Sequence, residues 1–142
     1  MISKTTLDTF ETFKSPASTL LGTRLIAFDE TARTTRMSFD VRPEFLNILG
    51  GVHGGLVAAM LDEAAGMGAR LSLPPDLVLP SLDFRVSFLA PAPAETLFAE
   101  TRCLRQGRRI AFLEADLLDK ADRLLARMNV TSIVVESSRA AS

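Results

Sequence analysis

The sequence contains neither tryptophan nor tyrosine, and it has one cysteine and one histidine among its 142 residues. A single cysteine, Cys103, excludes an internal disulfide and is best interpreted as a small core residue. The only histidine, His53, leaves no second imidazole for a thiol nucleophile, and no G-x-S-x-G motif supports a Ser-His-Asp hydrolase. No His/Cys/Asp cluster has the spacing of metal ligands. Hydrolysis through a metal or through one of these triads is therefore not expected.

Long apolar runs and an excess of charge are also missing. No apolar run reaches the roughly 20 residues of a membrane span, and the start lacks the basic-then-apolar layout of a secretory signal. The formal net charge of −1 gives no general attraction to nucleic acid or to an anionic membrane. With 47% hydrophobic and 23% charged residues, the composition is that of a globular protein. We expect a soluble, cytoplasmic protein with neither a nucleic-acid nor a membrane partner.

Hydrophobic periodicity divides the chain into a short helix, two strands, a long helix and four further strands. The short helix has Leu7, Phe10 and Phe13 on one face, can be capped by Thr6 and stops near Pro16. The strand-like runs occupy residues 19–30, 34–41, 77–91, 95–107, 108–120 and 123–135.

The long helix is predicted from about residue 53 to residue 70, with no proline before Pro74. Its apolar residues run all round it, which is typical of a helix inside a core. A curved antiparallel sheet wrapped round this helix is the simplest way to bury it, and the fold class is therefore α+β. We expect one domain over residues 19–136, with the short helix in residues 1–18 before it and a disordered tail, residues 137–142, after it.

The most informative segment is "NILGGVHGGLVAAMLDEAAG", residues 47–66. Asn47, Gly50, the tripeptide His53–Gly55 and Asp62 reproduce the pattern N-x-x-G-x-x-H-G-G-x-x-x-x-x-x-D. This pattern resembles that of the PaaI-like acyl-CoA thioesterases. They are hotdog-fold proteins, in which a sheet wraps round a helix. The similarity extends over roughly residues 19–135 and includes the "PSLDFRVSFLAPA" run and a following hairpin with a "QG" turn.

The resemblance implies hydrolysis of an acyl-CoA thioester and gives each matching residue a role. Gly54 matches the residue whose backbone N–H polarises the thioester carbonyl, Asn47 the side chain that supports this contact, and His53 the one that fixes the loop. Asp62 corresponds to the catalytic carboxylate, either nucleophile or general base. Ser81 corresponds to a hydroxyl that orients the attacking water. Coenzyme A would be part of the substrate, no cofactor is implied, and the acyl group, small and aromatic or of medium to long chain, stays open.

Elementary physical chemistry explains why these residue types suit the reaction. Free N–H groups at a helix start lie at the positive end of the helix dipole and can bind the oxyanion of the transition state. Glycine there removes a Cβ that would hold the carbonyl away, so we expect both Gly54 and Gly55 to contact substrate. Among alanine, methionine and leucine side chains, Asp62 would be poorly solvated and therefore a stronger base.

The spacing of the two catalytic groups predicts a dimer. Gly54 and Asp62 lie on one helix, roughly 12 Å apart along its axis, whereas a nucleophile attacks from about 3 Å. If both are catalytic, Gly54 of one subunit must face Asp62 of another, and a two-fold axis creates two equivalent sites. We expect a homodimer and, beyond it, a dimer of dimers, a homotetramer.

A basic cluster in "RCLRQGRR" consists of Arg102, Arg105, Arg108 and Arg109 round a turn. Guanidinium forks suit phosphate oxygens, so we expect at least one of them to contact the nucleotide end of coenzyme A. Ordinary solvated charges on a hairpin are an equally good interpretation of the same residues.

Other interpretations stay open as well. A non-catalytic acyl-CoA-binding regulator would need the oxyanion donors but no carboxylate, so Asp62 speaks against it. A hydratase is disfavoured because no Asp/His dyad has a suitable spacing. Glu63 has no role in the family pattern, and either acid could instead cap a loop or meet Arg85. The apolar face of the first helix either covers an acyl tunnel as a lid or docks on the sheet, and docking is favoured.

Overall fold

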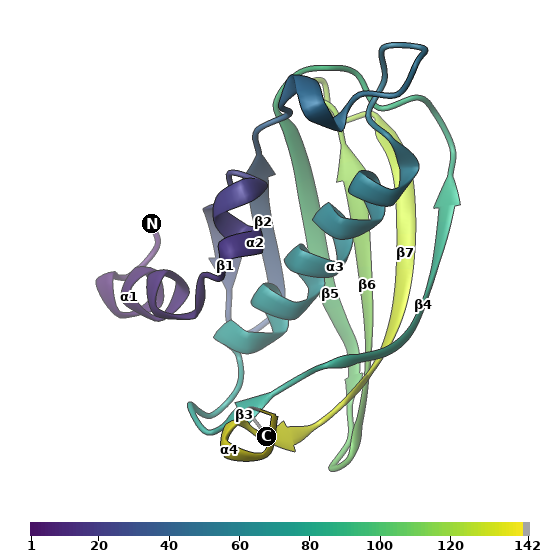
Figure 1. Ribbon diagram of the computed structural model, residues 1–142. Coiled ribbons are helices and arrows are strands. Elements are labelled where there is room, and N and C mark those ends of the chain that lie inside the picture. The colour runs from purple at the N-terminus through teal and green to yellow at the C-terminus, as the bar shows by residue number, and fades with distance from the viewer. Residues whose placement is uncertain (141–142) are drawn as a thin grey trace.

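A long helix, α3 (Gly54–Leu71), lies in the hollow of a curved antiparallel sheet (Figure 1). The computed structural model describes residues 1–140. The six strands follow the spatial order β1-β2-β5-β6-β7-β4. They are β1 (Arg24–Asp29), β2 (Thr34–Phe39), β4 (Ser81–Phe88), β5 (Leu97–Gln106), β6 (Ile110–Leu118) and β7 (Leu124–Ile133). The α+β arrangement of a sheet wrapped round one central helix is therefore confirmed.

Smaller elements lie at both ends of the chain and between the main ones. They are α1 (Lys4–Phe13), α2 (Pro16–Leu20), the 3-10 helix η1 (Pro43–Phe45), β3 (Leu77–Val78), β8 (Val135–Glu136) and α4 (Ser137–Ala140). The sequence predicted a disordered tail over residues 137–142. Ser137–Ala140 forms α4, and the N–H of Ser137 donates to the carbonyl of Asp76 at 2.7 Å. Residues 141–142 lie outside the described residues.

The first twenty residues form two helices where the sequence predicted one. Ser3, not Thr6, caps α1, because its hydroxyl accepts a hydrogen bond from the N–H of Thr6 at 3.1 Å. Pro16 does not merely end α1 but begins α2, since proline fits the first position of a helix. Ser15 and Ser18 complete a reciprocal capping box there.

Helix α1 docks against α3, whereas the favoured interpretation predicted docking on the sheet. Phe10 is buried in the core, and the guanidinium of Arg70 stacks over the ring of Phe13 at 3.9 Å from its centroid. Arg70 also donates to the backbone carbonyls of Leu73, Pro74 and Pro75. Its burial lowers the pKa of the guanidinium. These contacts fix α1 at the C-terminal end of α3, away from the glycine-rich start.

The face of the sheet turned away from α3 carries a network of ion pairs. Asp116 accepts hydrogen bonds from Arg127 at 2.6 Å and from Arg102 at 3.3 Å, and Arg102 also bonds to Glu114 at 2.7 Å. Burial alone would raise the pKa of Asp116, but the bonds from both arginines outweigh it and lower that pKa. Arg102 is therefore held by carboxylates on this face and is not a free member of the predicted phosphate-binding cluster.

Strand β4 is an open edge of the sheet. It pairs with β7 on one side, with Phe84 opposite Val130 and Phe88 opposite Ala126, and no strand of residues 1–140 lies on its other side. Phe84 is 42% exposed and Phe88 58% exposed. Both faces of this strand are accessible in the single chain.

Candidate active site

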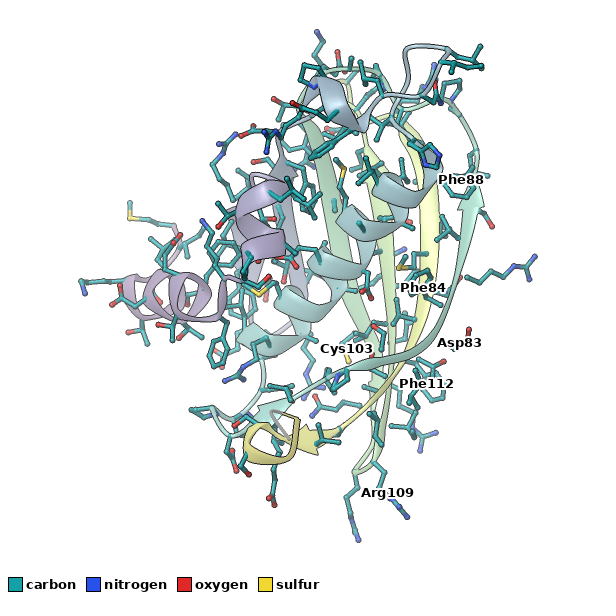
Figure 2. All side chains as sticks on the ribbon, viewed as in Figure 1. Asp83, Phe84, Phe88, Cys103, Arg109 and Phe112 are labelled. Carbon is teal, nitrogen blue, oxygen red and sulfur yellow. The ribbon has the colours of Figure 1, made fainter. Side chains whose placement is uncertain are left out.

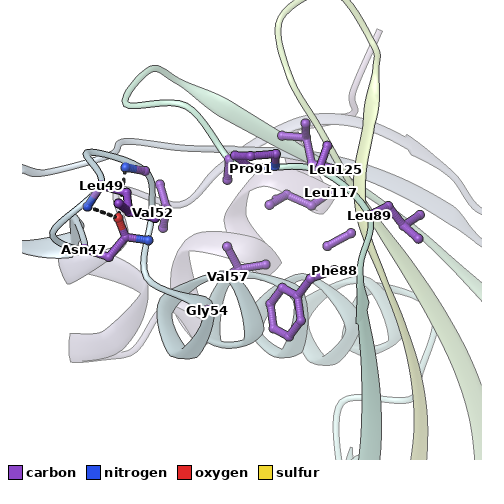
Figure 3. A pocket seen from close by; sticks show the side chains of 14 residues that line it. Asn47, Leu49, Val52, Gly54, Val57, Phe88, Leu89, Pro91, Leu117 and Leu125 are labelled. Carbon is purple, nitrogen blue, oxygen red and sulfur yellow. Dashed lines mark hydrogen bonds between the residues drawn. The ribbon is translucent and has the colours of Figure 1, made fainter.

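The loop that leads into α3 is closed by the side chain of Asn47. Its Oδ1 accepts hydrogen bonds from the N–H groups of Leu49 at 2.9 Å and Gly51 at 3.2 Å (Figure 3). Gly50 sits between them with a φ of +84°, a conformation that glycine adopts without strain. Asn47 thus fixes the conformation of this loop.

His53 is the N-cap of α3. Its Nδ1 accepts a hydrogen bond from the N–H of Gly55 at 3.1 Å, so the neutral ring carries its proton on Nε2. The N–H of Gly55 therefore has a partner in its own chain, and contact of Gly55 with substrate stays a prediction. The N–H of Gly54 has no acceptor within residues 1–140. It is the free donor at the positive end of the helix.

A cavity of about 550 Å³ opens beside Gly54 (Figure 3). It is lined by Asn47, Leu49, Gly51, Val52, Gly54, Val57, Phe88, Leu89, Ala90, Pro91, Ala92, Leu117, Leu125 and Ala126. Asn47 contributes the one polar side chain of this lining, and its amide nitrogen has no hydrogen-bond partner in the described part of the chain. Two donors, one from backbone and one from side chain, thus border an otherwise apolar space.

The ring of Phe88 forms the wall of this cavity next to the helix start. A Cβ added to Gly54 would lie 3.3 Å from Cζ of Phe88, so the ring packs directly on the glycine. Phe88 was not among the functional residues that the sequence predicted. The sequence of the strand alone does not predict this role, because the contact between Phe88 and Gly54 depends on how β4 packs beside the start of α3.

The predicted carboxylate and hydroxyl come together at the other end of β4. The Ser81 hydroxyl, on the first residue of β4, donates to Oδ1 of Asp62 at 2.6 Å. Asp62 is half-buried, so it is better solvated in the single chain than the sequence suggested. Glu63 accepts a short hydrogen bond from the buried hydroxyl of Ser18. The alternative that one of these acids meets Arg85 is not observed.

One chain holds the two halves of the expected site apart. Helix α3 runs uninterrupted from Gly54 past Asp62, which separates their backbones by about 12 Å along the axis. Neither Asp62 nor Ser81 lines the cavity at Gly54. Strand β4 runs antiparallel to α3, so Ser81 lies at Asp62 and Phe88 lies at Gly54 (Figure 1).

The remaining arginines of the basic cluster lie on the β5–β6 hairpin. Arg105, Arg108 and Arg109 are exposed, and none of them makes an ion pair with the described residues. The hairpin, with Arg109 at its tip, lies at the end of the sheet opposite to the start of α3 (Figure 2). The structure therefore does not bring these arginines to Gly54 of the same chain.

Three further observations concern the described residues. Within residues 1–140, no group of three or more histidine, cysteine, aspartate or glutamate side chains could hold a metal ion. Cys103, on β5, is half-buried against the hydrophobic core, in line with a structural role. None of the helices described is long and apolar enough to cross a membrane.

Comparison with known proteins places this geometry in a family. The thioesterase superfamily matches residues 49–126, more than half of the chain. Acyl-coenzyme A thioesterase 13 from Homo sapiens is 33% identical over 82 residues, which cover 57% of this chain and 58% of that protein. The chain spans about half the length of several of the curated relatives that it matches.

Solved structures share the fold. A phenylacetic acid degradation-related protein from Ralstonia eutropha JMP134 is 28% identical, with a TM-score of 0.82 over 88% of this chain and 98% of that one. The PaaI protein of E. coli is 18% identical, with a TM-score of 0.82 over 95% of this chain and 96% of that one, a likeness of fold alone. Together with the motif at the start of α3, these matches confirm the resemblance to PaaI-like proteins. The chain belongs to the thioesterase superfamily and has its hotdog fold.

Proposed function

We propose that the protein hydrolyses acyl-CoA thioesters at a site built by two copies of the chain. One observation carries this proposal: the free N–H of Gly54 and the Asp62–Ser81 pair lie at opposite ends of the same edge strand, β4, whose outer side pairs with no described strand. Each chain thus presents both halves of a hydrolytic site but cannot bring them to one carbonyl.

Self-pairing of β4 would join the halves. An open edge strand of 8 residues presents free N–H and C=O groups, and a two-fold axis through its middle pairs it with its own copy in antiparallel fashion. The Ser81 end of one strand then lies beside the Phe88 end of the other. Asp62 of the partner subunit is thereby carried toward Gly54, and the exchange creates two identical sites.

The distribution of exposed apolar side chains supports this association. A monomeric protein rarely leaves large apolar side chains grouped on one surface. Those at the loop tip and along and just after β4 are Ile48, Leu49, Leu82, Phe84, Phe88 and Leu89, and each is at least 42% exposed. A second copy seated on β4 would cover part of this surface.

The reaction then follows from the groups at hand. The carbonyl oxygen of the thioester accepts hydrogen bonds from the N–H of Gly54 and the amide of Asn47, which stabilise the developing oxyanion. The partner subunit's Asp62 either takes a proton from water or attacks the carbonyl carbon itself, and its Ser81 orients the water. The C–S bond breaks, the acyl carbon gains a water oxygen, and the thiolate of coenzyme A takes up a proton.

The nucleotide end of coenzyme A is assigned to the arginines of the β5–β6 hairpin. The same two-fold axis that moves Asp62 of the partner subunit also moves its hairpin to the Gly54 end of the first chain. Arg105, Arg108 and Arg109 have free guanidinium groups for the phosphates. A cytoplasmic setting, a dimer of dimers and the absence of any cofactor complete the proposal.

Replacement of Gly54 by proline tests the backbone donor. Proline removes this N–H alone, fits the first position of a helix, and suits His53, whose φ of −58° and ψ of 137° are those favoured before proline. We expect Gly54→Pro to lower kcat by about 10²–10³-fold. Gly54→Ala adds a comparable Cβ but keeps the N–H, so it should retain far more activity. Equal losses in both variants would contradict the role of the N–H.

A mixing experiment tests the shared site. Asp62→Asn and Gly54→Pro chains are inactive alone, but a mixed dimer has one site with both native groups. Random pairing should restore about a quarter of the wild-type activity, since half of the dimers are mixed and each has one intact site. A site within one chain, or an active monomer, would give no recovery on mixing.

A thioester panel separates the enzyme from a non-catalytic acyl-CoA-binding regulator. Thiol release is measured with benzoyl-, phenylacetyl-, hexanoyl- and palmitoyl-CoA. Tight binding of these esters without thiol release above background would favour the regulator. A single turnover in labelled water then distinguishes the two roles of Asp62, since label enters the carboxylate only if Asp62 attacks directly.

A further inference from the structure

We infer that Asp83, Phe84 and Arg85 set the register in which two copies of β4 pair with each other. The inference rests on the proposed function, because it takes the self-pairing of β4 from there. It adds which residues meet across the two-fold axis. Phe84 meets Phe84 of the partner subunit, and Asp83 of each strand meets Arg85 of the other.

Two opposite charges on β4 have no partner in their own chain. Asp83 pairs with Thr131 of β7 and Arg85 with Asn129, whereas Val130 between them belongs to the hydrophobic core. Successive residues of a strand point to opposite faces, so Asp83 and Arg85 are on the face of the sheet turned away from α3. Both are exposed, and neither makes an ion pair within residues 1–140.

The residue between the two charges is an aromatic one on the opposite face. Phe84 pairs with the buried Val130, yet its side chain is 42% exposed. Figure 2 shows Phe84 next to Asp83 on β4, at the open edge of the sheet. A second phenylalanine directly across the edge would cover this ring, and cross-strand aromatic pairs are among the pairs that stabilise sheets.

Symmetry limits the registers in which β4 can pair with its own copy. Residues directly opposite each other in a sheet point to the same face, and a two-fold axis perpendicular to the sheet keeps every residue on its own face. From Asp83 onward β4 alternates regularly, so the axis must pass beside one residue and its copy. The overlap is greatest, over residues 81–87 or 82–88, with the axis at Phe84 or at Arg85.

Charge distinguishes these two registers. With the axis at Arg85, each guanidinium lies opposite its own copy, and like charges in this position are destabilising. With the axis at Phe84, Asp83 of each strand lies opposite Arg85 of the other, which creates two ion pairs beside the phenylalanine pair. The sequence Asp-Phe-Arg is thus complementary to itself about its centre, and the partner that it fits is a second copy of this chain.

Charge reversal in mixed chains tests the register. Homodimers of Asp83→Lys would bring two lysines to Arg85, and homodimers of Arg85→Glu would bring two glutamates to Asp83. Each homodimer Kd should therefore rise about 10-fold. In the heterodimer of the two variants, the introduced lysine faces the introduced glutamate and Arg85 faces Asp83, so both pairs are attractive.

The fraction of heterodimer is the quantity to measure, by native mass spectrometry after subunit exchange. An equimolar mixture of Asp83→Lys and Arg85→Glu chains should contain about nine-tenths heterodimer. Wild-type chains with and without isotope label should give one half. The double variant Asp83→Lys/Arg85→Glu exchanges the two charges within one chain and should dimerise like the wild type.

A mixture of Glu30→Lys and Arg33→Glu chains is the matched control. Both residues are exposed and lie between β1 and β2, at the edge of the sheet opposite to β4. The two substitutions change the net charges of the chains by the same amounts as the test pair, so the mixture should contain one half heterodimer. Circular dichroism verifies that every variant is folded.

The outcomes are distinct. One half heterodimer in the test mixture, or an equal excess in the control mixture, would overturn the inference and leave the proposed hydrolysis untouched. A wild-type chain that stays monomeric would overturn both. Dimers that show the expected heterodimer excess but release thiol from none of the four thioesters would support the register and count against the proposed hydrolysis alone.

Discussion

The two faces of α3 differ in what covers them, although both are built from small and apolar residues. On the face toward the sheet, Met60, Leu61 and Ala64 are fully buried, and a Cβ on Gly68 would collide with the hydroxyl of Thr101. On the open face, a Cβ on Gly66 would meet nothing within 4 Å. We therefore regard Gly68 as a packing residue and Gly66 as one whose surroundings the single chain leaves empty.

This difference shows the limit of composition as a guide to burial. An all-round apolar helix is predicted to be covered on every side, yet one side of α3 is accessible and carries Asp62. The face against the sheet holds the fold together. The open face carries Asp62, the residue with the proposed chemical role. Four predictions sharpen this division, and three of them compare two residues of α3.

Asp62→Asn should have the largest effect. Without the carboxylate neither proton abstraction nor direct attack occurs, and kcat should fall by about 10²–10⁴-fold with little change in stability. Glu63→Gln, one residue further on the same helix, is the control and should stay within a few-fold of wild-type activity. If thiol release falls equally in both variants, the chemical role is not specific to Asp62.

Leu61→Ala should weaken the fold most. It empties a fully buried position between helix and sheet, and the free energy of unfolding should decrease by about 2–5 kcal/mol. Leu56→Ala, at a half-buried position, should have a smaller effect. Urea unfolding measures both, and equal losses would contradict the division into a packed and an open face.

The two glycines should respond to alanine with opposite signs. Gly68→Ala forces a methyl group against Thr101 and should destabilise the protein by about 1–3 kcal/mol. Gly66→Ala has space and improves helix propensity, so it should stabilise by up to about 1 kcal/mol. Destabilisation by Gly66→Ala would show that something covers this position in the assembled protein.

Ser18→Ala should have the smallest of the four effects. Its hydroxyl donates to Glu63 and takes part in the capping box of α2, so its loss should reduce the free energy of unfolding by about 1 kcal/mol. Activity should remain within a few-fold of the wild type, because Glu63 is not part of the proposed reaction. A large loss of kcat would show that α2 positions the neighbouring Asp62.

The sequence predicted the central helix to within one residue at each end, because its composition is strongly helical and no proline lies between His53 and Pro74. It failed at the N-terminus for a local reason. Ser3 and Thr6 are both good caps, and a proline such as Pro16 either ends one helix or begins the next. The docking of Phe10 and the capping box at Ser15 decide between these options, and both depend on contacts with other residues.

The candidate site, like the fold, could be predicted from the sequence only in part. The motif led to Asp62 and Gly54, and the hydroxyl of Ser81, to which the resemblance gave a role, donates a hydrogen bond to Asp62. The residues of the cavity wall were not predicted, because nothing in the sequence distinguishes Leu117 and Leu125 from other inward-facing residues of strands. They meet Gly54 only through the order of the strands. The hydrogen bond between the N–H of Gly55 and His53 depends on the side-chain rotamer of His53, which the sequence motif does not determine.

The free donor at the start of α3 belongs to the main chain, and this affects how the protein can evolve. Nineteen of the twenty amino acids would supply the same N–H at position 54. The size of the side chain next to the ring of Phe88, and not its reactivity, therefore decides which substitutions are tolerated there. At position 62, in contrast, the reactivity of the side chain decides which substitutions are tolerated. A change in side-chain size at position 54 and a change of functional group at position 62 are therefore separate evolutionary routes. By these routes such a hydrolase could acquire a new substrate preference or lose its activity.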